Sequence, residues 1–153
     1  MHERILAYLD EHGLTYKSLH HEVTLTSEDS ARVRGEDISI GGKALLLKYD
    51  KEFALFVLSA AKKLDSNAIK KHFGAKKLRF ASREELMEMT GLVPGSVPPF
   101  GRPLLDFDLY LDTSIVENER IAFNAGSLTD SVIMHVEDYL KIAPHEILHF
   151  SKT

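Results

Sequence analysis

A lysine that opens an apolar segment is the first candidate for chemistry in this sequence. Lys43 directly follows Gly41-Gly42 and precedes Ala44 to Leu47, which are all apolar. A lysine in this position usually extends its charged end along the surface to solvent. At the mouth of a pocket, however, the same cation can bind a carboxylate, a phosphate or a developing oxyanion. Lys43 is therefore a candidate anchoring or catalytic residue.

A loop rich in proline and glycine is the second candidate. Residues 91–103 contain four of the chain's five prolines and three of its nine glycines, so we expect a rigid loop without regular structure. Between Gly95 and Gly101, such a loop can hold backbone N–H groups in place for a ligand. The small-residue segment from Asn124 to Ser127, with Ser131 close behind it, is a third element of this kind. Each of these segments, taken alone, also fits an ordinary turn.

His145, Glu146 and His149 match the zinc-binding pattern H-E-x-x-H. On a helix, the two histidines would share one face and hold a zinc ion, with the glutamate as general base. Pro144 precedes the motif, only four residues follow it, and the alternation around Ile147 also fits a frayed strand. We therefore favour a chance match and keep a zinc hydrolase as the less favoured alternative.

Other common catalytic motifs are missing from the sequence. The chain has no cysteine, which excludes disulfides, thiolate metal sites and cysteine nucleophiles, and it has no G-x-S-x-G, P-loop or G-x-G-x-x-G. His20-His21 lacks a second pair at ligand spacing, so we interpret it as part of a surface loop. We expect no metal and no cofactor.

Charge is distributed unevenly along the 153 residues. The net charge of −4 argues against a protein that coats nucleic acid non-specifically, and we expect no DNA partner. The segment from Lys62 to Arg83 nevertheless contains eight basic residues and a single acid, Asp65, which gives it a net charge of +7. This segment is either a solvated face or a phosphate-contacting surface. Its candidate contacts are Lys62, Lys63, Lys70, Lys71, Lys76 and Lys77.

Short elements of both kinds must position these residues. The patterns predict strands at 43–49, 53–58, 77–80, 107–111, 120–124 and 131–136. They predict helices at 2–12, 66–73, 82–90, 114–117 and 137–142, and one between Thr26 and Gly35. The first two strands are joined by three polar residues and should form an antiparallel hairpin. Irregular alternation of this kind indicates one α+β domain over residues 1–153, with a mixed, largely antiparallel sheet.

Three of these segments, taken in order, resemble the YbaK/prolyl-tRNA synthetase-associated domain family. They are Gly42 to Lys48, Gly95 to Gly101, and Phe123 to Ser127 with Ser131, and the similarity extends from about Thr26 to Ile142. Members of this family are freestanding trans-editing proteins and the editing insertion of bacterial prolyl-tRNA synthetase. The resemblance implies a barrel-like, mixed β-sheet domain with peripheral helices. It also implies an aminoacyl-tRNA deacylase that hydrolyses the ester of mischarged tRNA in trans.

The resemblance also implies roles for single residues. The family's strand lysine falls on Lys43 and its G-x-x-x-P loop on Gly95 and Pro99, which are the expected catalytic residues. The expected substrate-binding residues are Ser96, Val97, Pro98, Phe100, Gly101, Asn124, Ala125, Gly126, Ser127 and Ser131. Asp112 and His135 match polar pocket residues of some members weakly. Alanine-specific members often have asparagine after the lysine, where this sequence has Ala44.

The chemistry of an aminoacyl ester suits these residues. The ester is already activated, so a site needs only to position it, supply water and stabilise an oxyanion. In such a site, N–H groups of the Gly95–Pro99 loop would hold the carbonyl oxygen, and Lys43 would anchor the 3′-terminal nucleotide. A small, rigid pocket fits editing of tRNA-Pro, or a similar tRNA, that carries a small wrong amino acid.

The expected partners and location follow from the same reading. We expect mischarged tRNA as the ligand, bound by the six lysines named above, with an aminoacyl-tRNA synthetase as a further candidate partner. A non-catalytic tRNA- or synthetase-binding domain of the same fold is the alternative. No apolar run approaches the roughly 18 to 20 residues that span a bilayer, and the first residues lack a signal peptide's apolar stretch. We therefore expect a cytoplasmic protein with no membrane partner.

Overall fold

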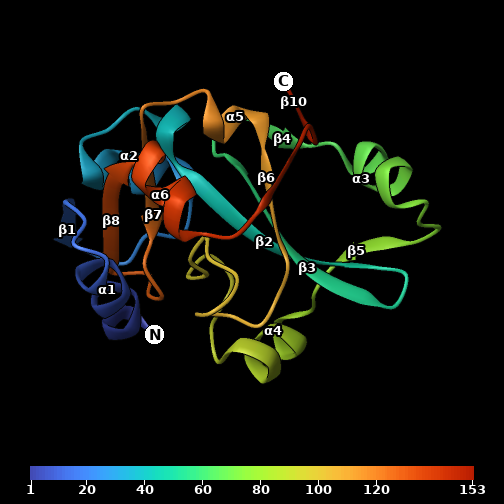
Figure 1. Ribbon diagram of the computed structural model, residues 1–153, viewed down its shortest axis with the longest axis horizontal. Helices are drawn as coiled ribbons and strands as arrows, with labels where there is room; N and C mark the ends of the chain where they lie inside the picture. Colours follow the sequence, from blue (N-terminus) through green and yellow to red (C-terminus); the bar gives the residue numbers. More distant parts are fainter.

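The computed structural model describes residues 1–153 as strands in three sheets surrounded by short helices (Figure 1). The helices are α1 (His2–Glu11), α2 (Ser27–Arg34), α3 (Ser66–Phe73), α4 (Arg83–Thr90), α5 (Thr113–Val116) and α6 (Val136–Ile142), with a 3-10 turn η1 (Ile38–Ile40). The strands are β1 (Tyr16–His20), β2 (Gly42–Tyr49), β3 (Glu52–Ser59), β4 (Lys63–Leu64), β5 (Leu78–Phe80), β6 (Leu109–Asp112), β7 (Arg120–Asn124), β8 (Asp130–His135), β9 (Glu146–Leu148) and β10 (Ser151–Lys152). No helix has the length and apolar composition that crossing a bilayer requires.

The sheets confirm the predicted α+β class and the predicted hairpin. The five-stranded sheet has the order β5-β2-β3-β6-β9, and β2 pairs with β3 in antiparallel register from Gly42↔Ser59 to Tyr49↔Glu52. In the same sheet, β6 runs parallel to both β3 and β9. A second, antiparallel sheet has the order β1-β8-β7. The sheets do not close on one another, so the predicted barrel-like form is not a closed barrel.

The helices begin and end at the residues that the sequence indicates. The Thr26 hydroxyl accepts a hydrogen bond from the Asp29 amide at the start of α2, and Ser82 with Glu85 forms a complete capping box at the start of α4. Three strands were not predicted: β1, β4 and β10. The short strand β9 matches the frayed-strand interpretation of the segment around Ile147. All four strands are short, so their pairing depends on tertiary contacts.

The apolar core lies on both faces of the five-stranded sheet. Alternate residues of β3 point in opposite directions, as the pleat requires. Leu55 and Val57 join the larger cluster with α1, the 91–103 loop, β7, β8 and α6. Phe56 and Leu58 join the smaller cluster, which includes Ile69 of α3. Burial on both faces fixes β2 and β3, and therefore fixes the backbone on which Lys43 stands.

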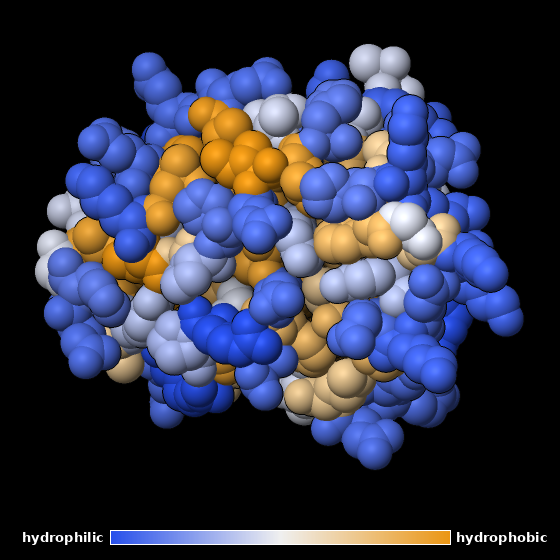
Figure 2. Space-filling model, turned by 45° about the vertical axis from the view of Figure 1, so that its right-hand side comes forward, coloured by the Kyte–Doolittle hydropathy of each residue, from blue (hydrophilic) through white to orange (hydrophobic).

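The arrangement places the two candidate functional regions at opposite ends of the β2–β3 hairpin. In Figure 1, α2, β7 and β8 surround the start of β2 at the left, whereas α3 and β5 flank the far end of the hairpin at the right. Figure 2 brings this right-hand side forward and shows hydrophilic side chains along its outer edge, with apolar side chains gathered toward the other half of the view.

Candidate active site

A cavity of about 170 Å³ opens beside the start of β2. It lies between α2, the first residues of β2, the 91–103 loop and the end of β7. Four of the residues predicted for the site line it, namely Lys43, Gly95, Val97 and Asn124. Two basic side chains line it and no carboxylate does. The cavity therefore favours groups that carry or develop negative charge.

Lys43 projects into this cavity from the second position of β2. Its Nζ donates a hydrogen bond to the carbonyl oxygen of Lys62 at 2.9 Å, and its side chain is half-buried. Burial lowers the pKa of Lys43, while the carboxylate of Glu28 acts in the opposite direction. An ammonium group has three donors, and only one of them is used inside the protein. Lys43 can therefore bind an incoming acceptor without losing its present contact.

Two residues of the 91–103 loop that line the same cavity have free backbone N–H groups. The Ser96 amide donates to the Val93 carbonyl at 3.1 Å, and Gly95 has φ +87°, so Val93 to Ser96 form a turn that requires glycine at its third position. The N–H groups of Gly95 and Val97 make no hydrogen bond within the protein. Because Pro94, Pro98 and Pro99 have no N–H and the loop residues after Pro99 do not line the cavity, these two are the loop's free donors beside the cavity.

The rest of the predicted loop residues support the loop from behind. The Pro99 carbonyl accepts a hydrogen bond from the buried Tyr139 hydroxyl at 2.5 Å, and the Phe100 ring packs against the rings of Phe123 and Tyr139. Gly101 lies so close to the Phe107 backbone that a Cβ would come within 2.5 Å of its carbonyl oxygen. Pro98 is buried as well. None of the four residues from Pro98 to Gly101 lines the cavity, in contrast to the expectation of catalytic or substrate contact.

The turn after β7 holds the loop in position. The Asn124 Nδ2 group donates to the Gly95 carbonyl at 2.7 Å, and the Gly126 amide donates to the Ser96 carbonyl at 3.0 Å. Ala125 is buried, and the Ser127 hydroxyl contacts Thr129 in its own turn. Ser96, Ala125, Gly126 and Ser127 are therefore next to the cavity but do not line it.

Arg34, at the end of α2, was not predicted and is the second cation of the cavity. Its Nε donates to the Ser131 hydroxyl at 3.0 Å, and its Nη2 donates to Asn124 Oδ1 at 3.0 Å. Burial lowers the pKa of Arg34 to about 10. In the sequence, Arg34 looks like an ordinary basic residue in a last helical turn. Predicted Ser131 is fully buried and acts as its hydrogen-bond partner instead of lining the cavity.

The hydroxyl groups on the α2 side of the cavity were also not predicted. Thr24 and Ser30 are both buried, and the Ser30 hydroxyl donates to Thr24 Oγ1 at 2.9 Å. This bond uses one of the pair's two hydroxyl protons, and no acceptor for the Thr24 proton is present in the protein. Thr26 and Ser27 line the same side. Together they make a polar wall that can bind a small hydroxylated group.

The structure contradicts the zinc alternative. His145 precedes the strand β9 and His149 follows it, so the two residues lie on extended backbone and not on one face of a helix. Three residues of strand lie between them, and four steps of about 3.3 Å place their backbones about 13 Å apart. Nδ1 of His145 contacts the Ala143 carbonyl oxygen, and Nδ1 of His149 contacts the Thr113 hydroxyl. No group of three metal-ligating side chains occurs in the structure.

The two weakly matched residues also lie outside the cavity. Asp112 is fully buried at the end of β6, where it accepts hydrogen bonds from the backbone amides of Phe150 and Ser114. His135 is exposed at the end of β8. His20, predicted in a loop, is instead the last residue of β1 and contacts Asp130, while His21 follows the strand and contacts Ser131.

The basic segment extends from the cavity toward the far end of the hairpin. Lys62 adjoins Lys43 through its carbonyl oxygen. The backbone amides of Lys76 and Lys77 donate to Asp50 Oδ1 in the hairpin turn, both at 3.0 Å. Asp50 is seven residues after Lys43 along extended backbone, which corresponds to about 23 Å. None of the six candidate lysines forms an ion pair, so their charges are available to phosphates.

Comparison with known proteins decides the family. The model of the aminoacyl-tRNA editing domain matches residues 21–142. The chain belongs to the aminoacyl-tRNA editing domain family. It is 35% identical to the multifunctional Ser/Thr-tRNA deacylase ProXp-y of Escherichia coli (strain K12), over 99% of this chain and 93% of that protein. It is also 36% identical to part of the proline–tRNA ligase of Shouchella clausii (strain KSM-K16), over 75% of this chain and 20% of the ligase.

A solved structure shows the same fold for an editing-domain protein. The crystal structure assigned as a trans-editing enzyme for prolyl tRNA synthetase superimposes with a TM-score of 0.86, at 23% identity, over 99% of this chain and 97% of that one. The resemblance inferred from three sequence segments is therefore confirmed, and so is the predicted class of activity, hydrolytic editing of mischarged aminoacyl-tRNA.

Proposed function

We propose that this editing domain removes a small, hydroxyl-bearing amino acid, serine or threonine, from mischarged tRNA in trans. The observation that carries the proposal is the 170 Å³ cavity, whose lining combines two cations, two residues with free backbone N–H groups and a wall of hydroxyls. A cavity of about 150 Å³ admits a ligand the size of benzene, so this one suits a small amino acid. The E. coli relative is named a Ser/Thr-tRNA deacylase, and Ala44 lines the cavity where alanine-specific members often have asparagine.

The reaction needs only groups that the cavity contains, together with water. Water adds to the ester carbonyl carbon, and the carbonyl oxygen becomes an oxyanion held by the N–H groups of Gly95 and Val97. The bond to the ribose oxygen then breaks, that oxygen leaves with a proton as a hydroxyl, and the amino acid departs as a carboxylate. Lys43 anchors the 3′-terminal nucleotide, and the neighbouring ribose hydroxyl directs the water. Loss of one oxyanion donor typically lowers the rate by about 10²–10³.

The polar wall of Thr24, Thr26, Ser27 and Ser30 determines which amino acid the cavity prefers. The unused proton of the Thr24–Ser30 pair would donate to the side-chain hydroxyl of serine or threonine. An amino acid without that hydroxyl leaves the pair unsatisfied in a partly desolvated site, which weakens binding of its transition state.

The partners we propose are a mischarged tRNA, tRNA-Pro or a similar one, and an aminoacyl-tRNA synthetase. The relation to proline–tRNA ligase supports the synthetase partner. The lysines between the cavity and the hairpin turn would contact phosphates near the 3′ end, and we place the reaction in the cytoplasm, with no role for DNA or a membrane.

A deacylation panel tests this function. Seryl-, threonyl-, alanyl- and cysteinyl-tRNA are incubated with wild type, with Lys43→Ala and with Lys141→Ala, an exposed lysine of α6 that serves as the matched control. We expect seryl- and threonyl-tRNA to be hydrolysed fastest, Lys43→Ala to lose most of the rate, and Lys141→Ala to match wild type. If no charged tRNA is hydrolysed faster than in buffer although tRNA binds, the non-catalytic alternative is correct.

A further inference from the structure

Arg34 is a partly buried cation that has no anionic partner. Its guanidinium bonds only to neutral oxygen atoms, the Ser131 hydroxyl and the Asn124 side-chain carbonyl. Two of its five N–H donors are used in this way, and three are free. Arg32 in the same helix, by contrast, pairs with Glu22 at 2.8 Å. A buried charge without a counter-charge is costly, so its presence in a cavity points to an anion that arrives during function.

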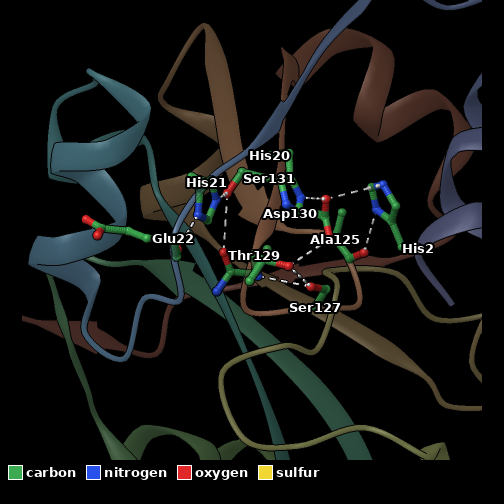
Figure 3. Close-up of polar contacts among 10 residues, drawn as sticks. His2, His20, His21, Glu22, Ala125, Ser127, Thr129, Asp130 and Ser131 are labelled. Carbon is green, nitrogen blue, oxygen red and sulfur yellow. Dashed lines mark hydrogen bonds and ion pairs between the residues drawn. The ribbon is translucent and has the colours of Figure 1, made fainter.

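A chain of hydrogen bonds fixes the direction of this guanidinium. The His21 Nδ1 atom lies 2.8 Å from the Glu22 carbonyl oxygen, which can only accept, so Nδ1 is the donor of this bond. His21 Nε2 lies 2.8 Å from the Ser131 hydroxyl, as Figure 3 shows, and that hydroxyl donates to Asn124 Oδ1 at 3.3 Å. The Ser131 oxygen is left to accept from Arg34 Nε. His21 and Ser131 are therefore positioning residues for Arg34.

The same guanidinium is joined to the 91–103 loop by one side chain, Asn124. Asn124 accepts from Arg34 through Oδ1 and donates through Nδ2 to the Gly95 carbonyl at 2.7 Å. Arg34, Gly95 and Val97 all line one cavity. The other cation, Lys43, is tied instead to Lys62, at the beginning of the basic segment. The two cations are therefore held by different parts of the fold.

We propose that Arg34 is a catalytic residue whose free N–H groups stabilise the oxyanion of ester hydrolysis, together with the amides of Gly95 and Val97. This inference rests on the proposed function. The ester carbonyl is neutral in the ground state and becomes charged only as water adds. An interaction that gains strength in the transition state raises kcat more than it lowers KM. A fixed fork in a site with little water is well suited to that task.

Kinetics on two substrates test the assignment. One substrate is seryl-tRNA, and the other is serine esterified to adenosine, which has the same ester but no phosphate. We expect Arg34→Gln to lower kcat by about 10²–10³ on both, with KM changed far less. A loss confined to seryl-tRNA would mean that Arg34 binds a phosphate, and a wild-type kcat for Arg34→Gln would mean that it binds neither group. Either result overturns the proposal.

Matched variants separate this role from a structural one. Arg32→Gln, in the same helix, should keep wild-type kinetics, and circular dichroism should show that Arg34→Gln is folded. Arg34→Lys keeps the charge but loses the fork, so its kcat should fall between the values for wild type and Arg34→Gln. Addition of guanidinium at low concentration should partly restore kcat to Arg34→Ala and not to Lys43→Ala. Absence of rescue, with the variant folded, would overturn the proposal.

The activity of wild type distinguishes failure of this inference from failure of the proposed function. If wild type hydrolyses neither substrate, both are overturned. If wild type is active and Arg34→Gln is equally active, only the role of Arg34 is overturned.

Discussion

Asp112 offers a stability test whose size can be worked out from its contacts. The carboxylate is fully buried, and it accepts hydrogen bonds from the Phe150 amide at 2.6 Å and the Ser114 amide at 3.0 Å. It thereby fastens the C-terminal segment to the end of β6. Burial alone would raise its pKa, but hydrogen bonds from Ser114, Phe150 and Ser151 outweigh burial and lower the pKa of Asp112.

Asp112→Asn should destabilise the fold by about 3 kcal/mol. The amide keeps one acceptor oxygen but turns an NH2 group toward the second backbone donor, so one bond to a charged group is lost and a buried N–H is left unpaired. For a chain of about this size, such a change lowers Tm by roughly 6–12 °C. Asp106→Asn is the matched control, because Asp106 is 94% exposed in its pair with Arg102 and should change stability little.

Chemical denaturation of both variants between pH 3 and pH 8 supplies the measurement. The folded-state pKa of Asp112 lies below the ordinary value, so the stabilisation is complete above that ordinary value and is lost as pH falls through the folded one. The difference between wild type and Asp112→Asn should therefore be constant from pH 6 to pH 8 and shrink below about pH 4. An Asp112→Asn variant as stable as the Asp106→Asn control would refute this account, and so would a pH-independent difference.

Three further variants probe the supports of the cavity and the proposed tRNA surface. Tyr139→Phe removes the buried bond to the Pro99 carbonyl and should cost about 1–3 kcal/mol in urea unfolding; an unchanged midpoint would contradict it. Gly101→Ala places a Cβ against the Phe107 carbonyl oxygen and should cost about 1–3 kcal/mol by the same assay; an unchanged midpoint would contradict this close packing. Replacement of four lysines by glutamate should weaken tRNA binding and reduce its dependence on salt concentration; the positions are Lys70, Lys71, Lys76 and Lys77. If binding titrations match those of wild type, the basic segment is only a solvated face.

Much of the fold is predictable because local signals and tertiary contacts agree. Thr26, Ser82 and the following glycines mark helix ends, and the apolar runs of β2 and β3 specify a hairpin whatever surrounds them. The strands β9 and β10 carry no comparable signal. They exist because Asp112 and the buried ring of Phe150 hold the C-terminal segment against the rest of the fold. Contacts between residues far apart in the sequence cannot be predicted from a local sequence pattern.

The site is predictable only where one segment contributes both geometry and chemistry. Lys43 and Gly95 stand out because each combines a special residue type with a special backbone. Arg34 and Thr24 do not, since their roles arise only when β8 brings Ser131 beside α2 and the loop brings Gly95 beside Asn124. The matched loop motif also includes residues that do not line the cavity. Phe100 and Gly101 come shortly after Val97 in the sequence, but they are packed behind the part of the loop that lines the cavity.

Arg34 and the lysines of the basic segment lie in different places, so we expect salt to affect kcat and KM differently. The lysines of the basic segment are largely exposed, so salt screens their attraction to phosphates and should raise KM for seryl-tRNA. Arg34 acts in a partly buried cavity, where screening by salt is weaker, so kcat should stay nearly constant over the same range. Serine esterified to adenosine has no phosphate, and its KM should be insensitive to salt. If salt lowers kcat on both substrates in parallel, the cation at the reacting carbonyl is exposed to solvent ions, and the separation of roles between Arg34 and the lysines is wrong. The net charge of −4 therefore describes the molecule as a whole and predicts neither response, because each depends on where a few cations lie.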